Sequence, residues 1–134
     1  METNDDSGGM SYTSIKPLIV TGKTPCGRGG VSVVLSDSKL ISFGGHWFET
    51  DNKFCYSDET WLLNIEQLSW HLKKCSGELP GPRYGHTAHI LGTRMFIFGG
   101  KGPNGIFYNQ VFFLDLIGWT WVSVNTASPG PDFR

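Results

Sequence analysis

The sequence lacks an excess of charge of either sign. Its 134 residues include 11 Lys and Arg against 12 Asp and Glu, which gives a formal net charge of −1. Proteins that bind nucleic acid or an anionic membrane surface usually carry a basic patch or a basic amphipathic segment. Neither is visible here, so we expect no nucleic-acid partner and no membrane partner.

Cysteine is scarce and irregularly placed. The three cysteines, Cys26, Cys55 and Cys75, are odd in number and form no C-x-x-C pair. The first residues contain no apolar segment of the kind that directs secretion, and no Asn-x-Ser/Thr glycosylation acceptor occurs. This pattern favours a reducing compartment, and we expect a cytoplasmic protein.

A sustained helical period is also absent. The chain is 39% apolar and 17% charged, and it contains 18 glycines, which favours short strands joined by tight turns over helices. Residues 1–14 are mostly polar and predict a disordered leader. The rest of the composition is that of a packed all-β protein.

The most informative feature that is present is an internal repeat. The segment LISFGG at residues 40–45 recurs as MFIFGG at residues 95–100, an offset of 55. Past the Gly-Gly pair the offset becomes 51, which takes Trp70 onto Trp121. The first copy therefore has four extra residues after Gly45, where a loop is expected. Repeats of about this period are typical of propeller blades or solenoids.

Each copy contains four strand-like runs joined by short polar turns. The runs lie at residues 30–35, 39–43, 58–65 and 69–74 in the first copy, and at 85–91, 94–98, 109–116 and 119–125 in the second. Short connections suit antiparallel hairpins, so each copy predicts a four-stranded antiparallel blade. These blades span residues 28–74 and 83–125. A strand at residues 15–20 is expected to belong to another blade, and residues 126–134 to begin a third repeat.

The pattern resembles the kelch repeat family over residues 15–134. The residues that carry the resemblance are Gly44-Gly45, Gly99-Gly100, Tyr56, Tyr108, Trp70 and Trp121. The opening Arg83-Tyr84-Gly85-His86 of the second copy is degraded to Arg-Gly-Gly-Val in the first. The resemblance implies a kelch-type β-propeller fragment. It also implies a non-enzymatic scaffold or adaptor for proteins, such as the substrate-recognition element of a ubiquitin ligase or an adaptor for cytoskeletal or trafficking proteins.

Two blades do not close a ring, because propellers typically need four to eight. We therefore expect the chain to be an N-terminal piece of a larger propeller. The remaining blades would come from the same protein in cis or from other copies in trans. Alternatives to the adaptor role are an oxidase-type or enzyme-accessory propeller, and a structural piece that assembles with itself.

Motifs that could carry chemistry are weak. The Gly22-Lys23-Thr24 segment looks like the end of a phosphate loop, but Pro17 occupies the position of a required glycine. His86 and His89 would lie on opposite faces of a strand, which does not suit two ligands of one metal ion. No G-x-S-x-G segment is present. The sequence predicts no catalytic residue, no metal site and no cofactor.

The loops after the Gly-Gly pairs are the predicted binding surface for a protein or peptide. In a four-stranded blade these loops, at residues 44–57 and 99–108, emerge on the same face as the connections between blades. The candidate binding residues are His46, Trp47, Phe48, Lys101, Asn104, Phe107, Arg28 and Arg83. Two alternatives stay open: the aromatic residues fold back to cover the rim, and the two arginines make structural bonds.

Overall fold

The computed structural model describes residues 19–125. The predicted leader, most of the predicted strand at 15–20 and the predicted start of a third repeat lie outside the described residues. Ile19 and Val20, the last two residues of the predicted strand, are described and are not part of a strand. Within residues 19–125 the structure is all-β apart from one short 3-10 turn, Pro103–Gly105, and no helix there could cross a bilayer.

Blade one is a four-stranded antiparallel sheet with strand order β1-β2-β5-β6. Its strands are β1 (Ser32–Ser36), β2 (Lys39–Phe43), β5 (Thr60–Asn64) and β6 (Ser69–Lys73). A two-residue turn joins β1 to β2, and Asp37 adopts a positive φ of 54° in it. Asp tolerates this left-handed conformation, which fits the twist of a tight hairpin.

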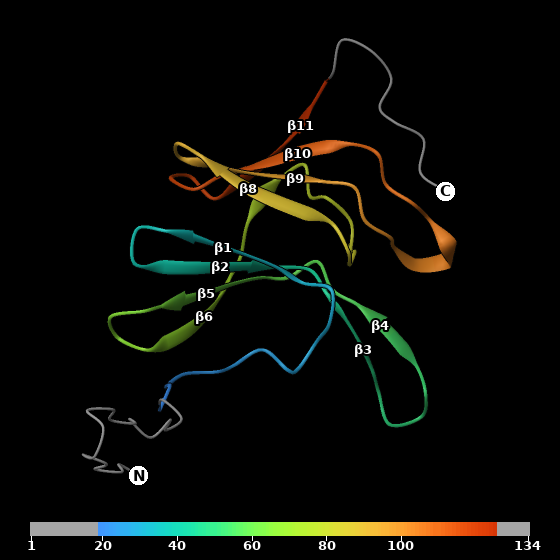
Figure 1. The fold of residues 1–134 in the computed structure, drawn as a ribbon, viewed down its shortest axis with the longest axis horizontal. Helices are drawn as coiled ribbons and strands as arrows, with labels where there is room; N and C mark the ends of the chain where they lie inside the picture. Colours follow the sequence, from blue (N-terminus) through green and yellow to red (C-terminus); the bar gives the residue numbers. More distant parts are fainter. Residues whose placement is uncertain (1–18, 126–134) are drawn as a thin grey trace, which may run out of the picture.

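Blade two repeats the same meander. Its strands are β8 (Thr87–Leu91), β9 (Arg94–Phe98), β10 (Val111–Asp115) and β11 (Thr120–Val124), paired in the order β8-β9-β10-β11. The two four-stranded antiparallel blades predicted from the repeat are therefore confirmed. Figure 1 shows the two sheets stacked face to face, with the innermost strands β1 and β8 adjacent.

A short parallel strand lies on the outer edge of blade two and was not predicted. This strand, β7 (Ser76–Gly77), belongs to the connection between blades and pairs with β11. Thr21 makes the equivalent parallel bridge with Ser69 of β6. Each connection therefore touches the outer strand of the blade that it enters, before it crosses to the innermost strand.

The segment at residues 44–57 was expected to be a loop, and that prediction is wrong. It forms a second hairpin from β3 (His46–Phe48) and β4 (Phe54–Tyr56), which pair in antiparallel register. Cross-strand aromatic contacts explain the pairing, because Phe48 lies opposite Phe54 with ring centroids 4.7 Å apart. In Figure 1 the hairpin extends from blade one on the side away from the β1–β2 turn.

The hydrophobic core lies between the blades. Alternate residues of each strand point to the facing sheet, as the twofold period of a strand requires. Blade one contributes Ile41, Phe43 and Leu62, and blade two contributes Met95, Ile97, Phe112, Leu114 and Trp121. Trp121 is 2% exposed and packs against Phe43 with centroids 4.9 Å apart. It fills the space between the two blades.

Trp70, the equivalent residue of blade one, lies on the opposite side of its sheet from this core. It pairs with Leu63 and packs edge to face against Trp61, at 6.4 Å between centroids. It is only half-buried, because no blade covers that face among the described residues. The two tryptophans therefore face in the same direction around the ring, each toward the preceding blade.

All four residues of the Gly-Gly pairs adopt a positive φ. Gly44, Gly45, Gly99 and Gly100 have φ of 77°, 105°, 76° and 97°. These angles are costly for residues with a side chain. A Cβ on Gly44 would also lie 2.6 Å from the carbonyl oxygen of Arg83, in the connection to blade two. The glycine is thus required for the two blades to approach one another.

Replacing Gly44 tests this requirement. We expect Gly44→Ala to lower the free energy of unfolding by more than about 2 kcal/mol, because it adds left-handed strain to a backbone clash. Gly27→Ala is the control, since no atom lies within 4 Å of a Cβ there. Urea unfolding of both variants measures the difference. Equal stabilities would contradict the close approach.

Candidate functional site

The β3–β4 hairpin carries an aromatic face. Because His46 pairs with Tyr56 and Phe48 with Phe54, the four rings lie on one side of the hairpin. His46 stacks on Phe54 with centroids 4.9 Å apart and an interplanar angle of 20°. Phe54 and Tyr56 lie 4.9 Å apart. Phe48, at the outer end, is 64% exposed, so the face ends in an accessible phenyl ring.

Tyr84, from the connection to blade two, completes this aromatic cluster. Its ring lies 4.2 Å from His46 and 5.7 Å from Tyr56, measured between centroids. The backbone of His46 also exchanges two hydrogen bonds of 2.9 Å with Gly29. The base of the hairpin is therefore fixed to both blades, while its tip projects.

Trp47 lies on the other face of the hairpin and covers Arg28. The Arg28 guanidinium carbon is 4.8 Å from the centre of the Trp47 ring. The same guanidinium donates to Ser57 Oγ at 3.0 Å and pairs with Glu59 at 3.1 Å. The Arg28 side chain is only 7% exposed. The Arg28 charge is therefore paired with Glu59 inside the protein, and its guanidinium packs against the Trp47 face of the hairpin.

Arg83 was predicted to be a binding residue, and the structure contradicts this because the residue has no exposed surface. Its guanidinium donates to the carbonyl oxygens of Gly81 at 3.2 Å and Gly99 at 3.0 Å. The guanidinium carbon also lies 3.7 Å from the centre of the Tyr108 ring. Burial lowers the pKa of Arg83 to about 10, so the cation persists at neutral pH. The open alternative of a structural arginine is the one observed.

The second predicted loop lies at the same end of the blades, as Figure 1 shows. Lys101 bridges to both Tyr84 and Phe107, and its ammonium nitrogen is 5.5 Å from the centre of the Phe107 ring. Asn104 occupies the 3-10 turn with a φ of 61° and is exposed. Phe107 is 51% exposed and its neighbour Ile106 is 46% exposed. Tyr84 thus connects the hairpin and this loop into one surface.

Seven predicted binding residues remain predictions as contacts for a partner. His46, Trp47, Phe48 and Arg28 belong to the hairpin and its support, and Lys101, Asn104 and Phe107 belong to the second loop. Sequence reasoning placed Phe54 and Ile106 in the two loops but did not select Tyr84, whose ring lies against His46. The spacing of aromatic residues on both sides of a polar turn is the signal that could have predicted the β3–β4 hairpin.

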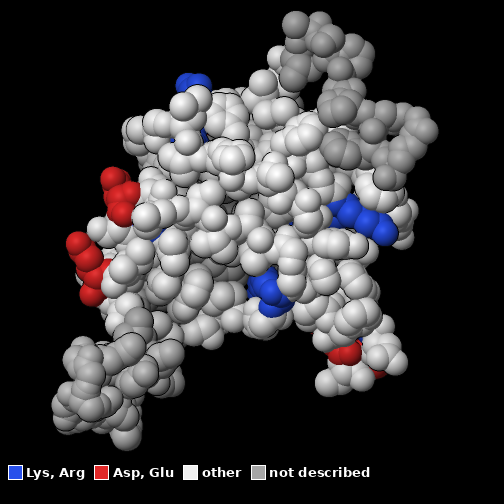
Figure 2. Space-filling model, viewed as in Figure 1, with Lys and Arg blue, Asp and Glu red and all other residues white. Residues whose placement is uncertain are grey.

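Charge does not define the site. Figure 2 shows basic and acidic side chains scattered over one face, without a large patch of one sign. Within residues 19–125 no group of three or more His, Cys, Asp or Glu side chains is placed to hold a metal ion. No cluster in this part of the chain therefore favours the oxidase-type alternative.

His86 is a packed residue beneath the site. It is 7% exposed, and its Nε2 lies 2.8 Å from Ser32 Oγ of blade one. Its ring also meets Phe43 edge to face at 5.4 Å. Burial, helped by the nearby Arg83 cation, lowers the pKa of His86 from 6.5 to about 4. The imidazole is therefore neutral at physiological pH and joins the two blades.

Two stacked antiparallel meanders joined at their inner strands are blades of a β-propeller. The solved structure of YjhT is similar over 77% of this chain and 40% of that chain, with a TM-score of 0.64 and 14% sequence identity. A family model described as the KLHDC2/KLHL20/DRC7 Kelch-repeats domain matches residues 10–134. The chain therefore belongs to the kelch-repeat family, whose domains generally mediate protein–protein interactions.

The relatives with similar sequences are much longer proteins. The flagellar outer arm dynein alpha chain of Chlamydomonas reinhardtii is 33% identical over 88% of this chain, but the match spans 3% of the dynein. Dynein regulatory complex subunit 7 of the same organism is 31% identical over 80% of this chain and 9% of its own length. Kelch repeat-containing protein 2 of Saccharomyces cerevisiae (strain ATCC 204508 / S288c) is 29% identical over 81% of this chain and 13% of its own length.

The depressed pKa of His86 predicts acid sensitivity. As the pH falls from 6.5 to 4, the unfolded chain binds a proton that the folded chain does not, so the free energy of unfolding falls by about 3 kcal/mol. Urea unfolding at several pH values measures this slope. His86→Gln should reduce the dependence of the free energy of unfolding on pH. His89→Gln, which changes an exposed residue, should leave that dependence as it is in the parent protein. The same slope in all three proteins would contradict the role of His86.

Proposed function

We propose that this chain is a non-enzymatic binding module whose β3–β4 hairpin contacts a protein or peptide partner. The observation that carries the proposal is the hairpin tip, where the 64% exposed Phe48 ends an otherwise packed aromatic cluster. Binding hot spots are commonly aromatic residues held on a rigid support, because little conformational freedom is then lost on binding. Phe107 and Ile106 extend the apolar surface on the second loop.

The polar groups around the tip would set specificity. Glu49, Asp51 and Lys53 lie in the turn between β3 and β4 and are exposed, and Lys101 and Asn104 lie on the neighbouring loop. A surface with an apolar centre and a mixed polar rim is typical of protein partners.

We also propose that the module acts in the cytoplasm as an adaptor for cytoskeletal machinery. Two of its relatives are named as a flagellar dynein chain and a dynein regulatory complex subunit, which favours this role over substrate recognition for a ubiquitin ligase. The outward faces of both blades would be covered by further blades in cis, since these relatives are far longer than the region matched.

The proposed site is tested at Phe48. We expect Phe48→Ala to weaken capture of specific partners at least about tenfold in quantitative pull-downs, because the ring is exposed and its loss leaves the core intact. Leu91→Ala is the matched control, since Leu91 is 71% exposed at the β8–β9 turn, on the opposite end of the blades. Equal partner recovery by Phe48→Ala and the parent protein would remove the hairpin from the binding surface.

A further inference from the structure

The outer edge of blade two is covered by its own connection. Ser76 donates its N–H to Trp119 O at 3.1 Å, and Glu78 donates its N–H to Trp121 O at 2.9 Å. The Glu78 carboxylate then accepts the N–H of Ser123 at 3.1 Å. The outward-pointing backbone groups of β11 are therefore satisfied as far as Ser123.

The same edge of blade one is covered only at its start. Thr21 donates its N–H to Leu68 O at 2.8 Å and accepts the N–H of Trp70 at 3.1 Å. Because alternate residues of a strand point the same way, the N–H and C=O of Leu72 also point outward. No partner for them occurs within residues 19–125.

One difference between the repeats explains the open edge. Leu72 is the repeat equivalent of Ser123, and Lys23 is the equivalent of Glu78. A lysine ammonium has no acceptor, so it cannot bond the Leu72 N–H as Glu78 bonds that of Ser123. An exposed edge of this kind is a template for pairing with another strand.

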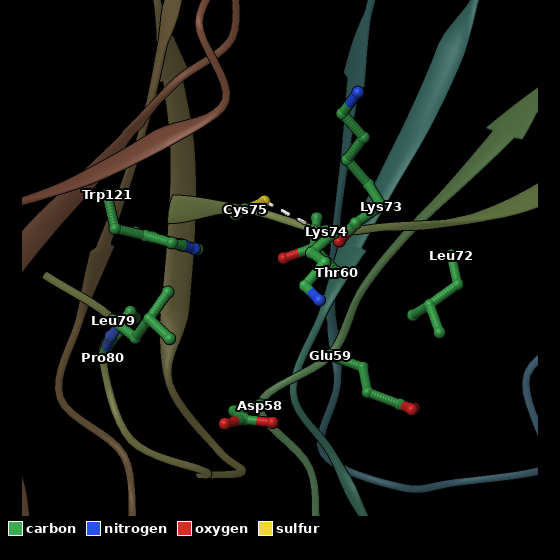
Figure 3. Close-up of a pocket in the computed structure, with 10 residues that line it drawn as sticks. All are labelled: Asp58, Glu59, Thr60, Leu72, Lys73, Lys74, Cys75, Leu79, Pro80 and Trp121. Carbon is green, nitrogen blue, oxygen red and sulfur yellow. Dashed lines mark hydrogen bonds between the residues drawn. The ribbon is translucent and has the colours of Figure 1, made fainter. Parts of the chain in front are cut away.

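A pocket of about 510 Å³ adjoins the open edge, between the two blades (Figure 3). It is lined by Asp58, Glu59, Thr60, Leu72, Lys73, Lys74, Cys75, Leu79, Pro80 and Trp121. The indole nitrogen of Trp121 points into the space between Cys75 and Leu79 in Figure 3. Its N–H has no hydrogen-bond acceptor among the described residues, and it is not one of their fully buried unpaired atoms, so it is open to the pocket. An indole N–H at the wall of a pocket can donate a hydrogen bond to a ligand that brings an acceptor.

The charges that remain available near the edge are mainly positive. Lys23 and Lys74 are exposed, and Lys73, the last residue of β6, has its ammonium nitrogen 5.1 Å from the centre of the Trp119 ring. Glu59 is already paired with Arg28, which leaves Asp58 as the free acid on the far side of the pocket. The edge itself therefore favours an acidic partner.

We propose that the β6 edge and this pocket form a docking site for an extended, acidic segment of a partner protein. The segment adds as a strand beside Leu72, and an apolar side chain enters the pocket. A backbone carbonyl of the segment accepts the Trp121 indole N–H. Strand addition takes its affinity from main-chain hydrogen bonds and its specificity from such side-chain pockets. This site is separate from the hairpin and goes beyond the function proposed above.

Nuclear magnetic resonance of the ¹⁵N-labelled chain tests the proposal. The probe is a short synthetic peptide in which Glu alternates with Val, with one central Leu. We expect it to shift the Leu72 amide and the Trp121 indole signals and to slow hydrogen exchange at Leu72. A Leu72 amide already protected without peptide would show that the chain's own residues cover the edge, which overturns the proposal. Equal binding of a peptide with Lys in place of Glu would overturn its acidic character.

Lys23→Glu is the decisive variant. It gives blade one a carboxylate that can accept the Leu72 N–H, as Glu78 accepts that of Ser123 in blade two, and it reverses a charge at the edge. We expect it to weaken peptide binding about tenfold or more, without lowering stability. Lys39→Glu, at the far end of β2, changes the net charge equally and should bind as the parent does. Unchanged binding by Lys23→Glu overturns the site. Phe48→Ala should leave peptide binding intact, which separates this test from that of the hairpin.

Discussion

The close approach of the inter-blade connection to Gly44 and Gly45 is the constraint on which the structure depends. Gly45 donates its N–H to Arg83 O at 2.8 Å, and Gly85 donates to Gly30 O at 2.9 Å. These bonds hold the backbones of the two blades close together. At this separation His86 reaches Ser32, and Trp121 packs against Phe43. A side chain at Gly44 would separate the sheets and open the core, because packed interiors tolerate little displacement.

The same connection organises the loop face. Buried Arg83 is a costly residue to desolvate, and two carbonyl oxygens and the Tyr108 ring offset that cost. Those contacts hold the loop after β9 against the connection, while the next residue, Tyr84, packs under the β3–β4 hairpin. Structural and exposed groups are therefore neighbours in sequence. The rigidity of the hairpin base is a consequence of the way in which the blades are joined.

The repeat made most of the fold predictable, because its offsets place strands and glycines independently of any loop. The β2 and β9 strands lie at the predicted residues, and both Gly-Gly pairs, which the repeat aligns, have positive φ. The hairpin was not predictable in the same way. Its four extra residues signalled an insertion, but pairing depends on Phe48 and Phe54 meeting across a turn that has no counterpart in blade two. The burial of Arg83 could not be predicted from the sequence either, because it depends on Tyr108, which lies 25 residues further along the chain.

Comparison of the two blades separates structural residues from candidates for function. Arg28 and Arg83 both donate Nε to a carbonyl two residues earlier, so this contact belongs to the blade itself. His46 and Lys101 occupy equivalent bridges to the preceding connection but present different side chains to the loop face. On the outer edge, Glu78 of blade two and Lys23 of blade one also occupy equivalent positions but carry different side chains. Because both blades satisfy the same folding constraints, a position where they diverge on the surface is free of those constraints. Such positions gather at the hairpin and at the β6 edge, which is where recognition can evolve without disturbing the interface between blades.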